Sequence, residues 1–187
     1  EIGFFGLYGV VDFLASEFRR PGDSPELSTY ELLLLNTDPE YVGFELDIGW
    51  AQLAGVNCGE LIRKYAGRFP LLHVKECNRV AKSDDELEHF PKFVMEMMKV
   101  QTAAGDNKNF IKGAPAFSPE QMEILYESRN WNVSLGEGLV DWADIRSAAE
   151  AQGVAAYINE REYYTIGGKK LTPLECARMD CDFLKQL

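Results

Sequence analysis

The chain has 187 residues, of which 46% are hydrophobic and 26% are charged. This composition is typical of a globular protein with a buried core, and it excludes collagen-like, low-complexity and intrinsically disordered chains. The net charge of -11 argues against binding to nucleic acid and to anionic membranes, because both need a basic protein surface.

No segment of the sequence resembles a targeting signal or a membrane span. The longest run without a strongly polar side chain, residues 2–11, is well short of the roughly 20 residues that a membrane-spanning helix needs. No basic region precedes this run, so a signal peptide is not expected. The four cysteines form no C-x-x-C pair, which favours reduced thiols and a cytoplasmic protein.

Apolar runs, turns and helical patterns alternate along the chain. Ser28 and Glu31 form a capping box, Pro119 suits the first position of a helix, and Asp141 begins a helix that Gly153 ends. In chain order, the sequence predicts an apolar run at 2–13, a helix from the Ser28 cap to 35, a strand at 41–47, a helix at 59–66, a strand at 71–75, helices at 84–102 and 118–129, a short strand at 132–135, a helix at 141–152, a strand at 154–160 and a helix at 172–187.

Strands that alternate with helices, with each strand mostly apolar, indicate an α/β fold with a parallel sheet. No linker divides the chain, so residues 1–187 are expected to form a single domain. The pattern holds about four βα units, which is half of a (β/α)8 barrel. A complete barrel normally needs roughly 200 residues or more, so a domain of the TIM-barrel type is expected to be incomplete here.

Three of the predicted strands end in a residue that can bind a metal ion. Asp47, His73 and Glu160 each follow an apolar strand, and the carboxyl ends of neighbouring parallel strands converge on one site. Two carboxylates and an imidazole form a mixed oxygen and nitrogen set that suits Mn²⁺, Mg²⁺, Co²⁺ or Zn²⁺. The alternative to a metal site is that each of the three residues makes an ordinary polar contact at the end of its strand.

Four segments, in order, resemble the xylose isomerase-like TIM-barrel family, which includes sugar phosphate isomerases and epimerases. Residues 44–57 are similar to its LDxxW segment, 68–76 to its segment with the metal-binding histidine, 135–142 to its GeG turn and 157–160 to its last strand. The resemblance covers residues 16–187 and implies that Asp47, His73 and Glu160 are metal ligands. Residues 84–102 and 118–129 then form a helical insertion.

The resemblance implies a divalent-metal-dependent isomerase or epimerase that acts on a sugar or sugar phosphate. Such an enzyme moves a proton next to a carbonyl through a metal-stabilised enediolate. Glu160 would be the base, and Lys75, on the same strand face as His73, would stabilise the oxygen. The residues expected to bind the sugar are Trp50, Glu76 and Glu137.

The residues themselves leave alternatives open. Lys75 is equally consistent with a surface lysine, Trp50 with core packing and Glu137 with an exposed turn. The family's further ligand on an earlier strand has no counterpart, because Glu17 and Phe18 match that segment but no histidine precedes them.

Two other functions therefore stay open beside the isomerase. One is a lyase similar to inosose dehydratase that uses the same site, and the other is an inactive half barrel that binds a partner or associates with itself. Whether the chain is an enzyme is not decided by the sequence. A half barrel leaves two sheet edges exposed, which soluble proteins rarely tolerate, so a homo-oligomer is expected.

Overall fold

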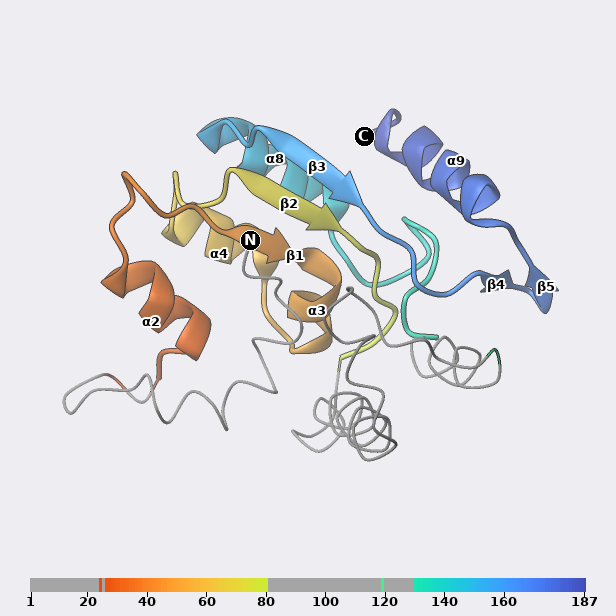
Figure 1. The fold of residues 1–187 in the computed structure, drawn as a ribbon, viewed down its shortest axis with the longest axis horizontal. Helices are drawn as coiled ribbons and strands as arrows, with labels where there is room; N and C mark the ends of the chain where they lie inside the picture. Colours follow the sequence, from red (N-terminus) through yellow and green to blue (C-terminus); the bar gives the residue numbers. More distant parts are fainter. Residues whose placement is uncertain (1–23, 25, 81–118, 120–129) are drawn as a thin grey trace, which may run out of the picture.

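The computed structural model describes residues 24, 26–80, 119 and 130–187. Figure 1 shows a small parallel sheet with helices on one side of it and a short hairpin near the carboxyl terminus. In chain order the elements are α2 (Thr29–Asn36), β1 (Glu45–Asp47), α3 (Ile48–Leu53), α4 (Cys58–Lys64), β2 (Leu71–Val74), α8 (Trp142–Gln152), β3 (Ala156–Asn159), β4 (Thr165–Ile166), β5 (Lys169–Lys170) and α9 (Pro173–Leu184).

The sheet consists of three parallel strands in the order β1-β2-β3. Asp47 is paired with His73, and His73 with Ile158. The predicted α/β class with a parallel sheet is thus confirmed for the described part of the chain. An incomplete barrel of about four βα units stays a prediction, as does the single domain.

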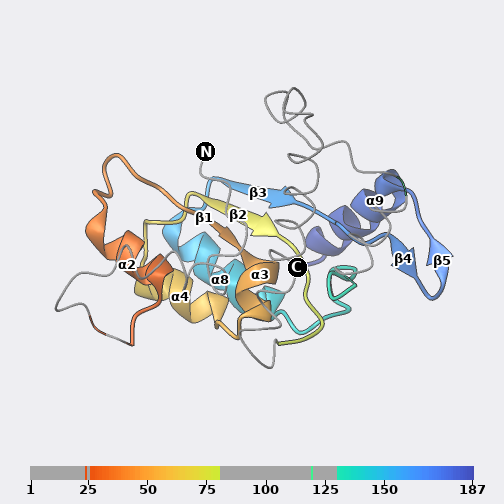
Figure 2. The same cartoon turned by 60° about the horizontal axis from the view of Figure 1, so that its bottom comes forward.

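One face of the sheet is buried beneath helices. Leu46, Leu72 and Val74 point to this face and are fully buried in a core that includes residues of α4 and α8. Figure 2 shows α3, α4 and α8 lying together on this side of the strands. Because side chains alternate along a strand, the acidic and basic residues of β1 and β2 lie on the opposite face.

The predicted helix starts are found where the sequence places them. Ser28 and Glu31 form the expected capping box of α2, and Asp141 caps α8 by accepting a hydrogen bond from the amide of Asp144. Gly153 ends α8 with a φ of 70°, a conformation that favours glycine. The fold adds α3, which the sequence analysis did not predict.

Several predicted boundaries differ from the structure. Residues 132–135 are not a strand, because β2 pairs directly with β3 and the amide of Leu135 donates to the Asp180 side chain instead of to a neighbouring strand. The strand predicted at 41–47 covers residues 45–47. The apolar run at 2–13 and the helix at 84–102 lie outside the described residues, as does the helix at 118–129 apart from Pro119. None of the described helices combines the length and apolar character needed to cross a membrane.

Candidate metal centre

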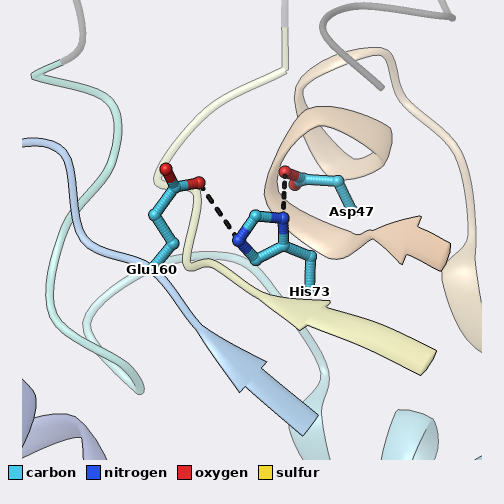
Figure 3. A group of neighbouring side chains, drawn as sticks. All are labelled: Asp47, His73 and Glu160. Carbon is cyan, nitrogen blue, oxygen red and sulfur yellow. Dashed lines mark ion pairs between the residues drawn. The ribbon is translucent and has the colours of Figure 1, made fainter. Parts of the chain in front are cut away.

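Asp47, His73 and Glu160 converge at the carboxyl end of the sheet. Their potential ligand atoms all lie within 4.8 Å of one another. His73 lies between the two carboxylates, with Nδ1 3.4 Å from Asp47 Oδ2 and Nε2 3.1 Å from Glu160 Oε2. Figure 3 shows both carboxylates pointing towards the imidazole ring from the two neighbouring strands.

Strand register places these side chains together. Asp47 and His73 are directly paired on β1 and β2 and therefore share a face. Ile158 is paired with His73, and Glu160 follows it by two residues, so Glu160 returns to the same face. Asp47 is also the N-cap of α3, where its Oδ1 accepts a hydrogen bond from the amide of Trp50 at 2.9 Å. This bond leaves Oδ2 directed at His73.

Lys75 is buried beneath the three residues, with 1% of its side chain exposed. Its Nζ lies 2.7 Å from Glu160 Oε2, 3.4 Å from Asp47 Oδ2 and 3.2 Å from Glu162 Oε2. Gly49 provides the room, because a Cβ at this position would lie 2.6 Å from Lys75 Cγ. The structure therefore brings Lys75 into the site and does not leave it on the surface.

Two further carboxylates border the site and were not identified from the sequence. Glu162 is buried against Lys75, and Glu45 Oε1 lies 3.6 Å from His73 Nδ1. Both lie two residues from a predicted ligand, so strand alternation was a signal that could have found them. With Asp47 and Glu160 they place four carboxylates around one ammonium group and one imidazole.

This charge balance and donor set fit a divalent cation. Among the residues that the structure describes, Glu45, Asp47 and Glu160 place three carboxylates around the imidazole of His73. Asp47, His73 and Glu160 offer two carboxylate oxygens and one imidazole nitrogen, which are ligands that Mn²⁺, Co²⁺ and Zn²⁺ accept and water can supplement. These residues are therefore able to hold such an ion.

The two ionisable partners of the site shift each other's pKa. The hydrogen bond from His73, joined by the charge of the nearby Lys75, outweighs the opposing effect of burial and lowers the pKa of Glu160 to about 2. Burial alone would lower the pKa of His73, but the Glu160 hydrogen bond and the charge of Asp47 outweigh it and raise that pKa. A metal ion would have to replace the proton of His73, because only neutral imidazole is a ligand.

Trp50 and Glu137, which are predicted to bind a sugar, lie in surroundings that differ from those of the metal-ligand residues. Trp50 is buried and packs edge to face on Trp131, with ring centroids 4.8 Å apart and Lys75 Nζ 5.8 Å from its ring. These contacts are those of core packing, which the sequence analysis left open as the alternative to sugar binding. Glu137 is exposed in a turn on the loop before α8. Stacking of a sugar on Trp50 and a substrate contact by Glu137 stay predictions.

Glu76 is predicted to bind substrate, and the structure gives its carboxylate a different task. The side chain is 1% exposed and accepts hydrogen bonds from the amides of Cys77, Gly136 and Val140 and from Trp142 Nε1. A carboxylate that accepts four N–H groups is fully engaged by the protein. Glu76 therefore anchors the loop at residues 135–142, and a substrate contact by Glu76 stays a prediction.

Comparisons with known proteins give a distant match. No protein-family description matches the sequence, and no curated protein sequence matches it. Among solved structures, a sugar phosphate isomerase/epimerase from Parabacteroides distasonis is similar, with 22% sequence identity and a TM-score of 0.49 over 91% of this chain and 42% of that chain. The chain spans less than half the length of that structure.

Proposed function

We propose that this chain carries the divalent-cation site of an isomerase or epimerase that acts on a sugar or sugar derivative. The observation that supports it is the convergence of Asp47, His73 and Glu160 at the carboxyl ends of three parallel strands. In parallel α/β folds this edge of the sheet is where catalytic side chains gather. The carboxylates of Glu45, Asp47 and Glu160 around His73 add the electrostatic reason for a cation to bind there.

In this proposal the residues of the site have different roles. Asp47, His73 and Glu160 would hold the ion, which supplies a Lewis acid that polarises a substrate carbonyl. Lys75, whose Nζ lies beside both ligand carboxylates, would donate a hydrogen bond to a substrate oxygen that gains negative charge. Glu160 is assigned as a ligand, because its carboxylate belongs to the convergent ligand set and lies 2.7 Å from Lys75 Nζ.

Titration calorimetry with Mn²⁺ tests the site. The wild-type chain should bind about one ion, and the His73→Ala variant should lose binding because a three-residue ligand set loses its imidazole. Glu150→Gln serves as the matched control, since Glu150 is an exposed carboxylate that pairs with Arg146 on the surface of α8. Equal Mn²⁺ affinity in the wild type and His73→Ala would contradict the proposal.

Proton exchange tests the reaction class. With Mn²⁺ in deuterated water, the proton next to the carbonyl of D-fructose or D-fructose 6-phosphate should be replaced by deuterium, as followed by proton NMR. The His73→Ala variant should show no exchange above background. Loss of a hydroxyl with the appearance of an absorbing enone would instead identify a lyase, and Mn²⁺ binding without either reaction would contradict the enzymatic part of the proposal.

A further inference from the structure

A second charged cluster lies directly behind the metal-ligand carboxylate. Arg161 follows Glu160 in the chain and is buried. Its Nε lies 3.3 Å from Asp180 Oδ2, its Nη2 donates to Asp180 Oδ1, and its Nη1 donates to Ser134 Oγ at 3.1 Å. The Arg161 and Asp180 side chains are 4% and 2% exposed. These contacts define the Arg161–Asp180 clamp.

The clamp joins three segments that are distant in sequence. Asp180 belongs to α9, and its carboxylate also accepts hydrogen bonds from the amide of Leu135 at 3.2 Å and from Asn159 Nδ2 at 3.5 Å. Asn159 and Arg161 are the two chain neighbours of Glu160, so one carboxylate on α9 contacts the residues on both sides of the ligand. The backbone at Glu160 is thereby tied to α9 and to the loop before α8.

Burial of this ion pair is better explained by a role in positioning the backbone beside Glu160 than by a contribution to folding stability. Removing two charges from water costs several kcal/mol per ion in principle, and a buried pair of this kind often adds little net stability. In α9, Cys176 and Asp180 are the buried residues, so a charged side chain forms a large part of what attaches this helix. A bidentate arginine and carboxylate pair also fixes geometry, because its paired hydrogen bonds have a defined orientation.

Without the clamp, Glu160 would have few constraints from the sheet. In the described part of the chain β3 pairs with β2 alone, and all four of its residues are exposed. Directly after β3 ends, the amide of Glu160 donates to the carbonyl of Val74 at 3.1 Å. The position of the carboxylate therefore depends on what holds residues 159–162.

We infer that the Arg161–Asp180 clamp positions Glu160 for metal binding, so that α9 controls the geometry of a site it does not contact. Asp180 and Arg161 act as positioning residues and touch neither ion nor substrate. The consequence for metal affinity rests on the function proposed above. Groups that orient a metal ligand typically contribute about 10- to 100-fold in metal affinity, and we expect the lower end because the clamp acts through the backbone.

The test compares Asp180→Asn with Asp144→Asn in the full chain. Asp144 pairs with Arg63 in a second arginine and aspartate contact, which joins α8 to α4 and whose side chains are 36% and 46% exposed. Asp180→Asn should weaken Mn²⁺ binding about tenfold in calorimetry and should raise amide hydrogen exchange in residues 159–162, measured by mass spectrometry without metal. Asp144→Asn should change neither quantity. A general loss of stability would also raise exchange in β1, whereas the clamp predicts no change there.

A milder variant covers the case in which Asp180→Asn fails to fold. Ser134→Ala removes the bond to Arg161 Nη1 and leaves both charges paired, so it should show the same effects at smaller size. Folded variants with wild-type Mn²⁺ affinity and wild-type exchange at 159–162 would overturn the inference. If the wild type binds no Mn²⁺, the metal site itself is wrong, and the hydrogen exchange data alone then decide whether the clamp holds this segment.

Discussion

At the scale of single residues, the site is a set of charges that hold one another in place. Glu160 contacts both His73 and Lys75, and Asp47 contacts the same two groups from the other side. Each of these four side chains thus has at least two partners in the site. These mutual contacts fix the ligand side chains relative to one another, and a preorganised ligand set reduces the ordering that metal binding must otherwise impose.

The lowered pKa of Glu160 predicts how acid affects the metal-free protein. Its pKa in the folded state is about 2, below the ordinary value of 4.5, so ionised Glu160 stabilises the fold above about pH 4.5. This contribution should disappear as the pH falls towards 2. The free energy of unfolding of the wild type, measured by urea denaturation with chelator present, should therefore decrease more steeply over this range than that of Glu160→Gln.

The matching control is Glu150→Gln, because Glu150 is an exposed carboxylate that pairs with Arg146 on the surface of α8. Its pH profile should run parallel to that of the wild type. Parallel profiles for the wild type and Glu160→Gln would mean that the ionised Glu160 does not stabilise the folded state.

At the scale of elements, the loop at residues 132–142, which leads into α8, is organised by one buried carboxylate. Glu76 accepts hydrogen bonds from Gly136, Val140 and Trp142, and a Cβ on Gly138 would lie 2.3 Å from Glu76 Oε1. Asn132 bridges the same region, since it donates to the carbonyl of Glu76 and accepts from the amide of Glu162. The loop therefore connects the strand of His73 to the segment of Glu160.

Replacing Glu76 with glutamine should destabilise the protein. The amide group exchanges an acceptor for a donor where both carboxylate oxygens already receive N–H groups. A buried group left without its partner costs roughly 1–3 kcal/mol, and urea denaturation should show a loss of that order. Glu137→Gln, on the exposed part of the same loop, should stay within about 0.5 kcal/mol of the wild type; an equal effect of both variants would contradict this account of Glu76.

Sequence patterns predicted the site residues whose positions follow directly from the end of a strand. Asp47, His73 and Glu160 each follow an apolar strand, and parallel pairing then brings strand ends together. The hydrogen bonds of Glu76 were not predicted, because the neighbouring histidine motif does not reveal that a loop about 60 residues later folds back over the carboxylate. The contact of Arg161 with Asp180 joins a strand end to a helix face and leaves no periodic signal in the sequence.

At the scale of the whole molecule, the described residues form a sheet with two unlike faces. The face beneath α3, α4 and α8 is apolar and contributes the core. The opposite face carries Glu45, Asp47, His73 and Lys75, and none of the described helices is shown lying across it. Binding chemistry and core packing are thus separated by the thickness of one sheet, so ligand variants such as His73→Ala remove little of the core.

The close approach of Gly49 to Lys75 has a consequence for how this site varies among homologous chains. A methyl group at position 49 would meet the lysine stem within 2.6 Å and push its ammonium away from the carboxylates. Glycine at 49 and lysine at 75 are therefore expected to covary: chains that keep this lysine should keep the glycine, and chains with a short side chain at 75 are free to carry alanine or serine at 49. An alignment in which the two positions change independently would mean that the lysine side chain reaches the carboxylates without the room that a glycine at 49 provides.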